Sequence, residues 1–261
     1  MVRAIPDILA QIAEDKRREI TALSSRVESL LPAAQASIAT RRNFHAALTS
    51  RPIAVIAEIK QASPSKGVLS ENFNPARIAE QYAEGRAAAL SVLTDQKYFH
   101  GSLDDLAAAR AAVSLPVLRK DFTLDESQIV EAAAHSADAV LLIAALLSRD
   151  QLRTLREAAA RYHIASLVEV HNEAELDEAL ASGAGIIGVN NRDLRTFSVN
   201  LDVSLRLAPR IPSSVLAVAE SGIHTRSDID RLRDAGFRGF LIGERLMRAP
   251  DPTRALEDLL A

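Results

Sequence analysis

The sequence predicts an α/β fold, a (β/α)8 TIM barrel with an N-terminal helical extension. Short, uniformly apolar runs alternate with stretches rich in Ala, Leu, Glu and Arg, which is typical of buried parallel strands separated by helices. About eight such units occur, as a closed barrel requires. A doubly wound open sheet usually binds its ligand at one switch point, whereas here polar residues end apolar runs along the whole chain. These run ends are Lys60, Lys120, Glu169, Asn190 and Glu220.

The predicted strands are continuous apolar runs rather than alternating ones, as expected for strands covered on both faces. They span residues 53–59, 88–93, 115–118, 139–143, 165–170, 185–189, 215–219 and 237–242. The predicted helices are rich in strong helix formers. They span residues 127–134, 150–162, 173–181, 227–235 and 252–260.

Helix termini carry their own signals. Three predicted helices begin with capping-box spacing, in which the first side chain accepts from an orphan backbone N–H and the third returns the bond. Three glycines follow helical stretches, where a left-handed backbone is least costly without a Cβ. The capping pairs are Ser148 with Gln151, Asn172 with Glu175, and Thr225 with Asp228, and the glycines are Gly85, Gly183 and Gly236.

Residues 1–50 precede the first predicted strand, and part of this segment has the spacing of an amphipathic helix. The apolar residues with this spacing are Ile8, Ile12, Ile20 and Leu23. No linker-like or low-complexity stretch divides the rest of the chain. We therefore predict one domain overall, in which an N-terminal helical extension (1–50) caps a barrel of residues 51–261.

Composition and charge exclude several functions. With 31 basic and 34 acidic residues the net charge is −3, which leaves no basic footprint for nucleic acid. The longest apolar run, residues 139–147, is far shorter than the roughly 20 residues of a membrane-spanning helix. Charged residues interrupt the start of the chain, unlike a secretory signal. We expect a cytoplasmic protein with no nucleic-acid or membrane partner. Cysteine chemistry is also excluded. The chain contains no cysteine, which rules out disulfides, a thiolate nucleophile and a Cys-ligated metal.

Two apparent motifs do not predict a site. Gly183, Gly185 and Gly188 match the dinucleotide-binding pattern, but they follow a helix and enter a strand, the reverse of the required order. The six histidines lack the spacing of a metal site, so no metal is predicted. His171 follows Glu169 by two residues, and we expect it to be a solvent-facing loop residue.

The first polar strand end carries two ionisable residues. Glu58 and Lys60 are two apart on one strand, so both point to the same face, which in a barrel is the interior near the rim. Burying both unpaired is costly, so they form either a functional pair or a structural ion pair. Ser63 then opens a polar loop, residues 63–67, that is placed to close over a ligand.

Seven ordered stretches at the strand ends resemble the indole-3-glycerol phosphate synthases of tryptophan biosynthesis. This resemblance implies a monomeric or weakly associating (β/α)8 barrel without metal or organic cofactor. It also implies a sugar-phosphate substrate, 1-(2-carboxyphenylamino)-1-deoxyribulose 5-phosphate, which is cyclised with loss of CO2 and water. The stretches are residues 56–67, 91–102, 116–122, 167–171, 187–194, 219–222 and 240–248.

The resemblance implies catalytic roles that suit this reaction. Ring closure requires a proton on the ketone oxygen as the aromatic carbon attacks, and Lys120 matches the family's general acid. Glu169 matches the carboxylate that assists the dehydration. Lys60 either binds the substrate carboxylate or supplies the acid for loss of hydroxide, with Glu58 orienting it; the sequence does not say which lysine acts at which step. The remaining matches are the positioning pair Asn190 and Arg192, and Glu220 with Ser221 near the substrate hydroxyls.

The resemblance also predicts two binding regions. Loops after the seventh and eighth strands can present backbone N–H groups to a phosphate, as barrels commonly do, although the glycines there also fit simple turns. Apolar side chains match positions that hold the anthranilate ring, for which ordinary core packing is an alternative. The phosphate-binding residues are Ser221, Gly222, Gly243 and Glu244, and the ring-binding residues are Phe99, Phe122, Leu141 and Leu194.

Two positions depart from the family pattern, and three other functions stay open. Arg86 follows Gly85 where a small apolar residue is expected, and Glu244 stands where serine is common, so only its backbone is expected to help an anion. Phosphoribosylanthranilate isomerase is nearly excluded because its acid–base pair uses a cysteine, and this chain contains none. Another sugar-phosphate isomerase or lyase would not need two strand-end lysines. A non-enzymatic descendant would have lost at least one of Lys60, Lys120 and Glu169.

Overall fold

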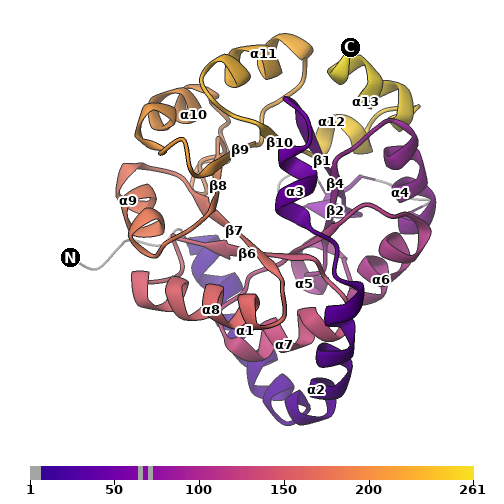
Figure 1. Cartoon of the computed structure of the whole chain (residues 1–261), viewed down its shortest axis with the longest axis vertical. Coiled ribbons are helices and arrows are strands. Elements are labelled where there is room, and N and C mark those ends of the chain that lie inside the picture. The colour runs from indigo at the N-terminus through magenta and orange to yellow at the C-terminus, as the bar shows by residue number, and fades with distance from the viewer. Residues whose placement is uncertain (1–6, 64–66, 70–72) are drawn as a thin grey trace.

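The computed structural model describes residues 7–63, 67–69 and 73–261. Its parallel strands close into a barrel in the order β1-β10-β9-β8-β7-β6-β5-β4, and helices surround it (Figure 1). The predicted (β/α)8 barrel is therefore confirmed. The barrel strands are β1 (Ala54–Ile59), β4 (Ala89–Leu93), β5 (Val117–Lys120), β6 (Ala139–Ile143), β7 (Ala165–Val170), β8 (Ile186–Asn190), β9 (Leu216–Glu220) and β10 (Gly239–Ile242).

The helices follow the strands along the chain and pack on the outside of the barrel. A short hairpin, β2 (Ala62–Ser63) and β3 (Gly67–Val68), lies between β1 and the first of them. The larger helices are α4 (Pro75–Glu84), α6 (Leu103–Ala112), α7 (Glu126–Ala134), α8 (Arg149–Arg161), α9 (Glu173–Ala181), α10 (Asp202–Leu207), α11 (Arg226–Asp234) and α13 (Pro252–Leu260). The shorter ones are α5 (Gln96–Phe99), the 3-10 helix η2 (Ala208–Arg210) and α12 (Glu244–Met247).

The strand predictions hold to within two residues at each end, and β8 and β9 each extend one residue beyond the prediction, to Asn190 and Glu220. The shift of the third strand is the most informative. The third predicted strand, 115–118, is β5 at Val117–Lys120, because Arg119 and Lys120 continue the ladder and Lys120 pairs in register with Leu93. Charged residues lowered the apparent strand signal at this end. The strand thus carries Lys120 to the carboxyl rim as an integral part of the sheet.

The side chains of each strand alternate between two apolar layers. Ile56 of β1 packs inside the barrel with Leu118 and Leu141, whereas Val55 and Ala57 pack outward against the helices. Glu58 follows Ile56 by two residues, so the pleat points it into the barrel near the rim. The same alternation directs the polar residues that end β5, β7, β8 and β9 into one opening.

Two of the three predicted capping boxes are present, at Ser148 with Gln151 and at Thr225 with Asp228. For the third predicted capping box, Asn172 with Glu175, only one of the two hydrogen bonds forms. Asn172 accepts from the backbone N–H of Glu175, but the Glu175 carboxylate accepts from the backbone of His171 instead of closing the box.

Gly183 (φ 83°) and Gly236 (φ 107°) have the predicted left-handed backbone. The prediction for Gly85 is wrong, because its φ is −72° and the left-handed residue is Arg86. A Cβ on Gly85 would lie 2.9 Å from the carbonyl oxygen of Thr253 in α13, so a close approach of helices explains this glycine.

From residue 7 on, the helical segments before the first strand are α1 (Asp7–Ser24), α2 (Val27–Ala36), the 3-10 helix η1 (Ser37–Thr40) and α3 (Phe44–Thr49). Figure 1 labels α1, α2 and α3. In α3, Phe44 and Leu48 are buried and join the interior apolar layer of the barrel. In α1, the ammonium of Lys16 is buried 2.8 Å from Asp95 and 2.9 Å from Asp121. These contacts tie α1 to the rim beside β4 and β5. Among the helices of the described residues, none is both long and apolar enough to cross a bilayer.

Candidate active site

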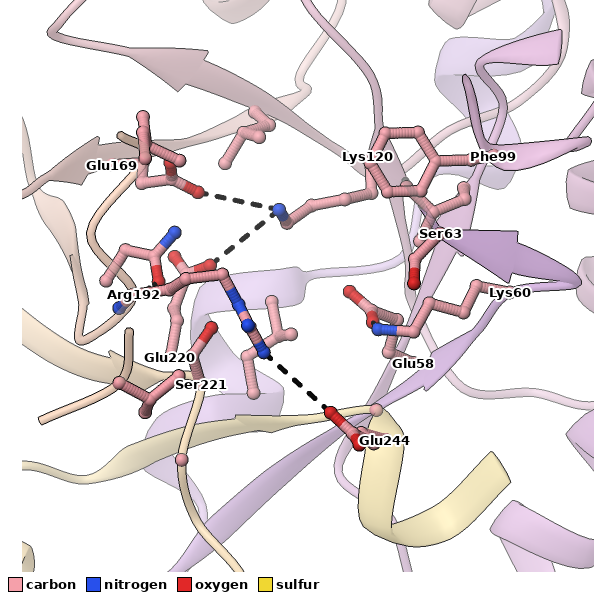
Figure 2. A pocket seen from close by; sticks show the side chains of 18 of the residues that line it. Glu58, Lys60, Ser63, Phe99, Lys120, Glu169, Arg192, Glu220, Ser221 and Glu244 are labelled. Carbon is pink, nitrogen blue, oxygen red and sulfur yellow. Dashed lines mark hydrogen bonds and ion pairs between the residues drawn. The ribbon is translucent and has the colours of Figure 1, made fainter. Parts of the chain in front are cut away.

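A cavity of about 590 Å³ opens at the carboxyl ends of the strands. Its wall brings together every residue that the sequence predicted for the site, from stretches far apart in the chain (Figure 2). These residues are Glu58, Lys60, Ser63, Phe99, Lys120, Phe122, Leu141, Glu169, Asn190, Arg192, Leu194, Glu220, Ser221, Gly222, Gly243 and Glu244. Of the loop 63–67, residues 64–66 lie outside the described part of the chain.

Lys120 lies at the centre of the charged groups. Its ammonium is 3.5 Å from Oε2 of Glu169 and 3.8 Å from Oε2 of Glu220, and it points between the two in Figure 2. Burial alone would favour the neutral amine, but Glu169, Glu220 and Glu58 outweigh burial and raise the pKa of Lys120 above its ordinary value. The lysine is therefore an ammonium aimed into the cavity.

Glu58 and Lys60 form a second pair, with 2.5 Å between Oε1 and Nζ. Burial opposes ionisation of Glu58, but Lys60 and Lys120 outweigh burial and lower the pKa of its carboxyl group. A Cβ on Gly243 would overlap Oε1 of Glu58. Glycine directly after β10 therefore makes room for this carboxylate.

Glu169 lies near the end of β7 and Glu220 ends β9, with β8 between the two strands, and the two carboxyl groups differ in charge. Burial opposes ionisation of Glu169, but Lys120 and His171 outweigh it and hold the pKa of Glu169 well below its usual value. Burial and the nearby Glu169 raise the pKa of Glu220 to about 8. Glu220 is therefore mostly protonated at neutral pH. Its Oε1 is buried against Gly188, where a Cβ would overlap it.

His171 is not the solvent-facing loop residue that the sequence predicted. Its side chain is 12% exposed, with Nε2 3.3 Å from Glu169 and Nδ1 3.0 Å from Glu175. The signal that was present is the spacing: His171 follows Glu169 by two residues, and Glu175 lies four residues further on. Two carboxylates around one histidine favour an inward-facing imidazolium.

A small polar network around Arg192 lines another part of the cavity. Oδ1 of Asn190 accepts from the backbone N–H of Arg192 at 3.0 Å. Nη2 of Arg192 lies 3.8 Å from Oε2 of Glu244, as the dashed line in Figure 2 marks. The side chain of Glu244 therefore faces a cation across the opening. An anion entering here meets the guanidinium of Arg192 as well as the backbone.

The turn after β9 has a left-handed backbone at two successive residues. Ser221 (φ 65°) and Gly222 (φ 79°) are both left-handed, and the left-handed region costs a non-glycine residue about 1 kcal/mol. Gly243 follows β10 and is the N-cap of the short helix α12. The two turns lie at the same rim and both line the cavity.

Apolar side chains also line the cavity. The rings of Phe99 and Phe122 lie 6.2 Å apart at 38°, and Leu141 and Leu194 line the same cavity. The sequence did not predict that the extension also contributes to this lining. Its residues there are Ile8, Leu9 and Ile12 of α1.

A closed barrel with paired lysines and carboxylates at the carboxyl ends of its strands defines a (β/α)8-barrel enzyme. Comparison with known proteins identifies the family. The family model for indole-3-glycerol phosphate synthase matches residues 9–259. The chain is 50% identical over 255 residues to the indole-3-glycerol phosphate synthase of Koribacter versatilis (strain Ellin345), covering 97% of this chain and 98% of the relative. It is 51% identical over 261 residues to that of Albidiferax ferrireducens, covering 98% of each. The chain therefore belongs to the indole-3-glycerol phosphate synthase family, a family of carboxy-lyases in tryptophan biosynthesis.

Solved structures with low sequence identity share the fold alone. The thiamine phosphate pyrophosphorylase from Pyrococcus furiosus matches with a TM-score of 0.61 and 17% identity, over 80% of this chain and 94% of that one. A structure described as KGPDC from Streptococcus mutans matches with a TM-score of 0.60 and 10% identity, over 80% of this chain and 95% of that one. These likenesses support the barrel and carry no conclusion about the reaction.

Proposed function

We propose that the cavity converts 1-(2-carboxyphenylamino)-1-deoxyribulose 5-phosphate to indole-3-glycerol phosphate, with the named side chains as its acid–base groups. The observation that carries this proposal is the Lys120 ammonium, which lies between Glu169 and Glu220 in the same cavity as the Glu58–Lys60 pair. Such an arrangement supplies two acids and one ionised base within reach of one substrate.

In the first half of the reaction, the aromatic carbon that bears the carboxylate attacks the ketone carbon. A carbon–carbon bond forms, and the ketone oxygen takes a proton from the ammonium of Lys120. The carboxylate then leaves as CO2, and its bonding electrons restore the aromatic ring. Placing a preformed cation at the developing alkoxide stabilises the transition state more than the ground state.

In the second half, the new hydroxyl group leaves as water. Lys60 protonates this oxygen, with Glu58 holding the lysine in place, and Glu169 removes a proton from the neighbouring methylene carbon. The carbon–oxygen and carbon–hydrogen bonds break, and the double bond of the pyrrole ring forms. Two protons come from lysines and one returns to Glu169, which balances the one proton that the whole reaction consumes.

We assign the binding roles from the side chains that line the cavity. The anthranilate ring packs against the apolar side chains, the phosphate binds in the turns after β9 and β10, and polar groups orient the remainder of the substrate. The proposed ring contacts are Phe99, Phe122, Leu141 and Leu194; the phosphate contacts are Ser221, Gly222, Gly243 and Glu244; and the orienting groups are Ser63, Asn190, Arg192 and Glu220.

We further propose that the chain acts in the cytoplasm as a monomer or weak homo-oligomer, as one domain in which residues 1–50 cap a barrel of residues 51–261. Support for the cap comes from α1, which both lines the cavity and inserts Lys16 between Asp95 and Asp121 at the rim.

The reaction is tested by incubating the purified protein with the carboxyphenylamino sugar phosphate and following indole absorbance and fluorescence. Because the chain has no tryptophan and only three tyrosines, the fluorescence of the product is observed over a low background. We expect one CO2 released for each indole formed. Absence of product, or substrate loss without CO2, would contradict the proposal.

A further inference from the structure

The residue that follows β7 connects the cavity to a carboxylate behind it. His171 directs Nε2 to within 3.3 Å of Oε1 of Glu169 and Nδ1 to within 3.0 Å of Oε2 of Glu175. The other oxygen of Glu169, Oε2, faces Lys120 at 3.5 Å. The carboxylate of Glu169 is thus held from both sides, by the imidazole on one oxygen and by the ammonium on the other.

Glu175 is itself fixed in position. It belongs to the first turn of α9, its side chain is 8% exposed, and its carboxylate accepts from the backbone N–H of His171 at 2.8 Å and from Nδ2 of Asn172 at 2.7 Å. These bonds replace the reciprocal capping box that the sequence predicted. The carboxylate is therefore turned toward His171 by the start of the helix.

We propose that His171 is a positioning residue for the reaction, which as an imidazolium holds Glu169 ionised and oriented between itself and Lys120. This inference rests on the proposed role of Glu169 as the base in the dehydration step. His171 acts through Glu169, so it changes the state of that carboxylate rather than reacting itself.

The charge of the imidazole supports this role. Burial opposes protonation of His171, but Glu169 and Glu175 outweigh burial and raise its pKa to about 10. A cation on each side keeps Glu169 ionised beside Glu220, with which it would otherwise share a proton. Besides His171, the groups that influence the ionisation of Glu169 and Glu220 are Lys120 from β5, Glu58 from β1 and Asn190 from β8.

The test compares H171N with the parent enzyme and with H163N, a control at a histidine on the surface. Without the imidazolium, Glu169 binds a proton more readily, so the acid limb of the kcat profile moves to higher pH by about one to three units. Loss of a charge-assisted contact should lower kcat at neutral pH by about 10-fold, with KM nearly unchanged. H163N should leave both the limb and kcat where they are.

Two further measurements do not depend on how well H171N folds. The ring nitrogens of His171 in the parent enzyme, followed by NMR, should stay doubly protonated to about pH 10. E175Q keeps an acceptor for Nδ1 but removes the charge, so it should lower the titration midpoint of His171. A midpoint near the ordinary value of 6.5 in the parent would overturn the inference.

E169Q separates failure of this inference from failure of the proposed function. If E169Q is inactive while the acid limb of H171N is unchanged, the role of His171 is wrong and that of Glu169 stands. If E169Q keeps full turnover, the role of Glu169 is wrong and this inference fails with it. A fall in the melting temperature of H171N without movement of the limb would show a purely structural role and also overturn the inference.

Discussion

Lys120 lies between two carboxylates that differ in protonation. The ammonium of Lys120 compensates the charge of one carboxylate, Glu169. The second carboxyl group, Glu220, is too deeply buried beside Glu169 to ionise until the pH reaches about 8. Glu220 can therefore donate a hydrogen bond at neutral pH, whereas Glu169 can only accept. Their different neighbours give the two carboxyl groups opposite hydrogen-bonding capacities.

Lys120→Ala should lower kcat by at least ~10²-fold, the scale of losing a general acid, while substrate still binds. Steady-state turnover with the sugar phosphate, together with a direct binding measurement, checks both parts. Lys97→Ala is the matched control, because Lys97 is exposed and its pair with Asp15 lies at the surface. Equal turnover of Lys120→Ala and the parent would show that another group supplies the proton.

Glu220→Gln should stabilise the protein in a pH-dependent way. The pKa of Glu220 is raised from 4.5 to about 8 in the folded state, so its stabilising contribution is complete below pH 4.5 and is lost as the pH rises to 8. Glutamine does not titrate. The melting temperature of Glu220→Gln should therefore match the parent below pH 4.5, and exceed it by a margin that grows until pH 8. A margin that stays constant with pH would show that Glu220 ionises normally.

At the scale of the elements, two buried carboxylates at the rim, Glu58 and Glu220, each lie against a glycine in or directly after the neighbouring strand. Gly243 after β10 faces Glu58 of β1, and Gly188 of β8 faces Glu220 of β9. The backbone of Gly243 has φ −121°, outside the left-handed region, and the close approach of Glu58 gives a direct reason for glycine at this position. Small residues on one strand thus determine where a functional group of the next strand lies.

Gly243→Ala should displace Glu58, disturb its pair with Lys60 and lower kcat/KM by about 10- to 100-fold, as expected for a small misplacement of reacting groups. Gly185→Ala is the control, because a Cβ there meets nothing within 4 Å. Both variants should keep the circular dichroism spectrum of the parent. Full activity of Gly243→Ala would show that Glu58 has room to move without consequence.

At the scale of the whole molecule, the sequence was sufficient to predict features that depend on a local, repeated pattern of residues. Apolar runs that end on polar residues predicted the strands. They also predicted which polar residues line one cavity, because the carboxyl ends of all strands in a parallel barrel meet at the same rim. Features that depend on distant packing were not predictable. Gly85 is glycine because α13 lies close, and Lys16 meets Asp121 only once α1 has docked. The inward turn of His171 is different, because its partner Glu175 is only four residues away and the spacing was visible in the sequence.

Docking of α1 should make the cap and the barrel one cooperative unit. Lys16 is 3% exposed, and undocking would remove the ammonium from Asp95 and Asp121. Breaking a buried ion pair from one side costs about 3 to 5 kcal/mol, and exposure of the apolar face of α1 adds to it. This sum is comparable with the 5 to 15 kcal/mol that stabilises a whole domain, on the usual order of magnitude.

The chain contains no cysteine, so a single introduced thiol reports the opening of one element. Ala13→Cys in α1 and Ala158→Cys in α8 both replace buried alanines. We expect the two thiols to become reactive at the same urea concentration, because cap and barrel unfold together. In a Lys16→Met background the thiol at position 13 should react at lower urea than the one at position 158, whereas Arg17→Met, at an exposed arginine, should leave them coincident. Earlier labelling of position 13 in the otherwise unchanged chain would mean that the extension undocks by itself and that the chain is not a single cooperative domain.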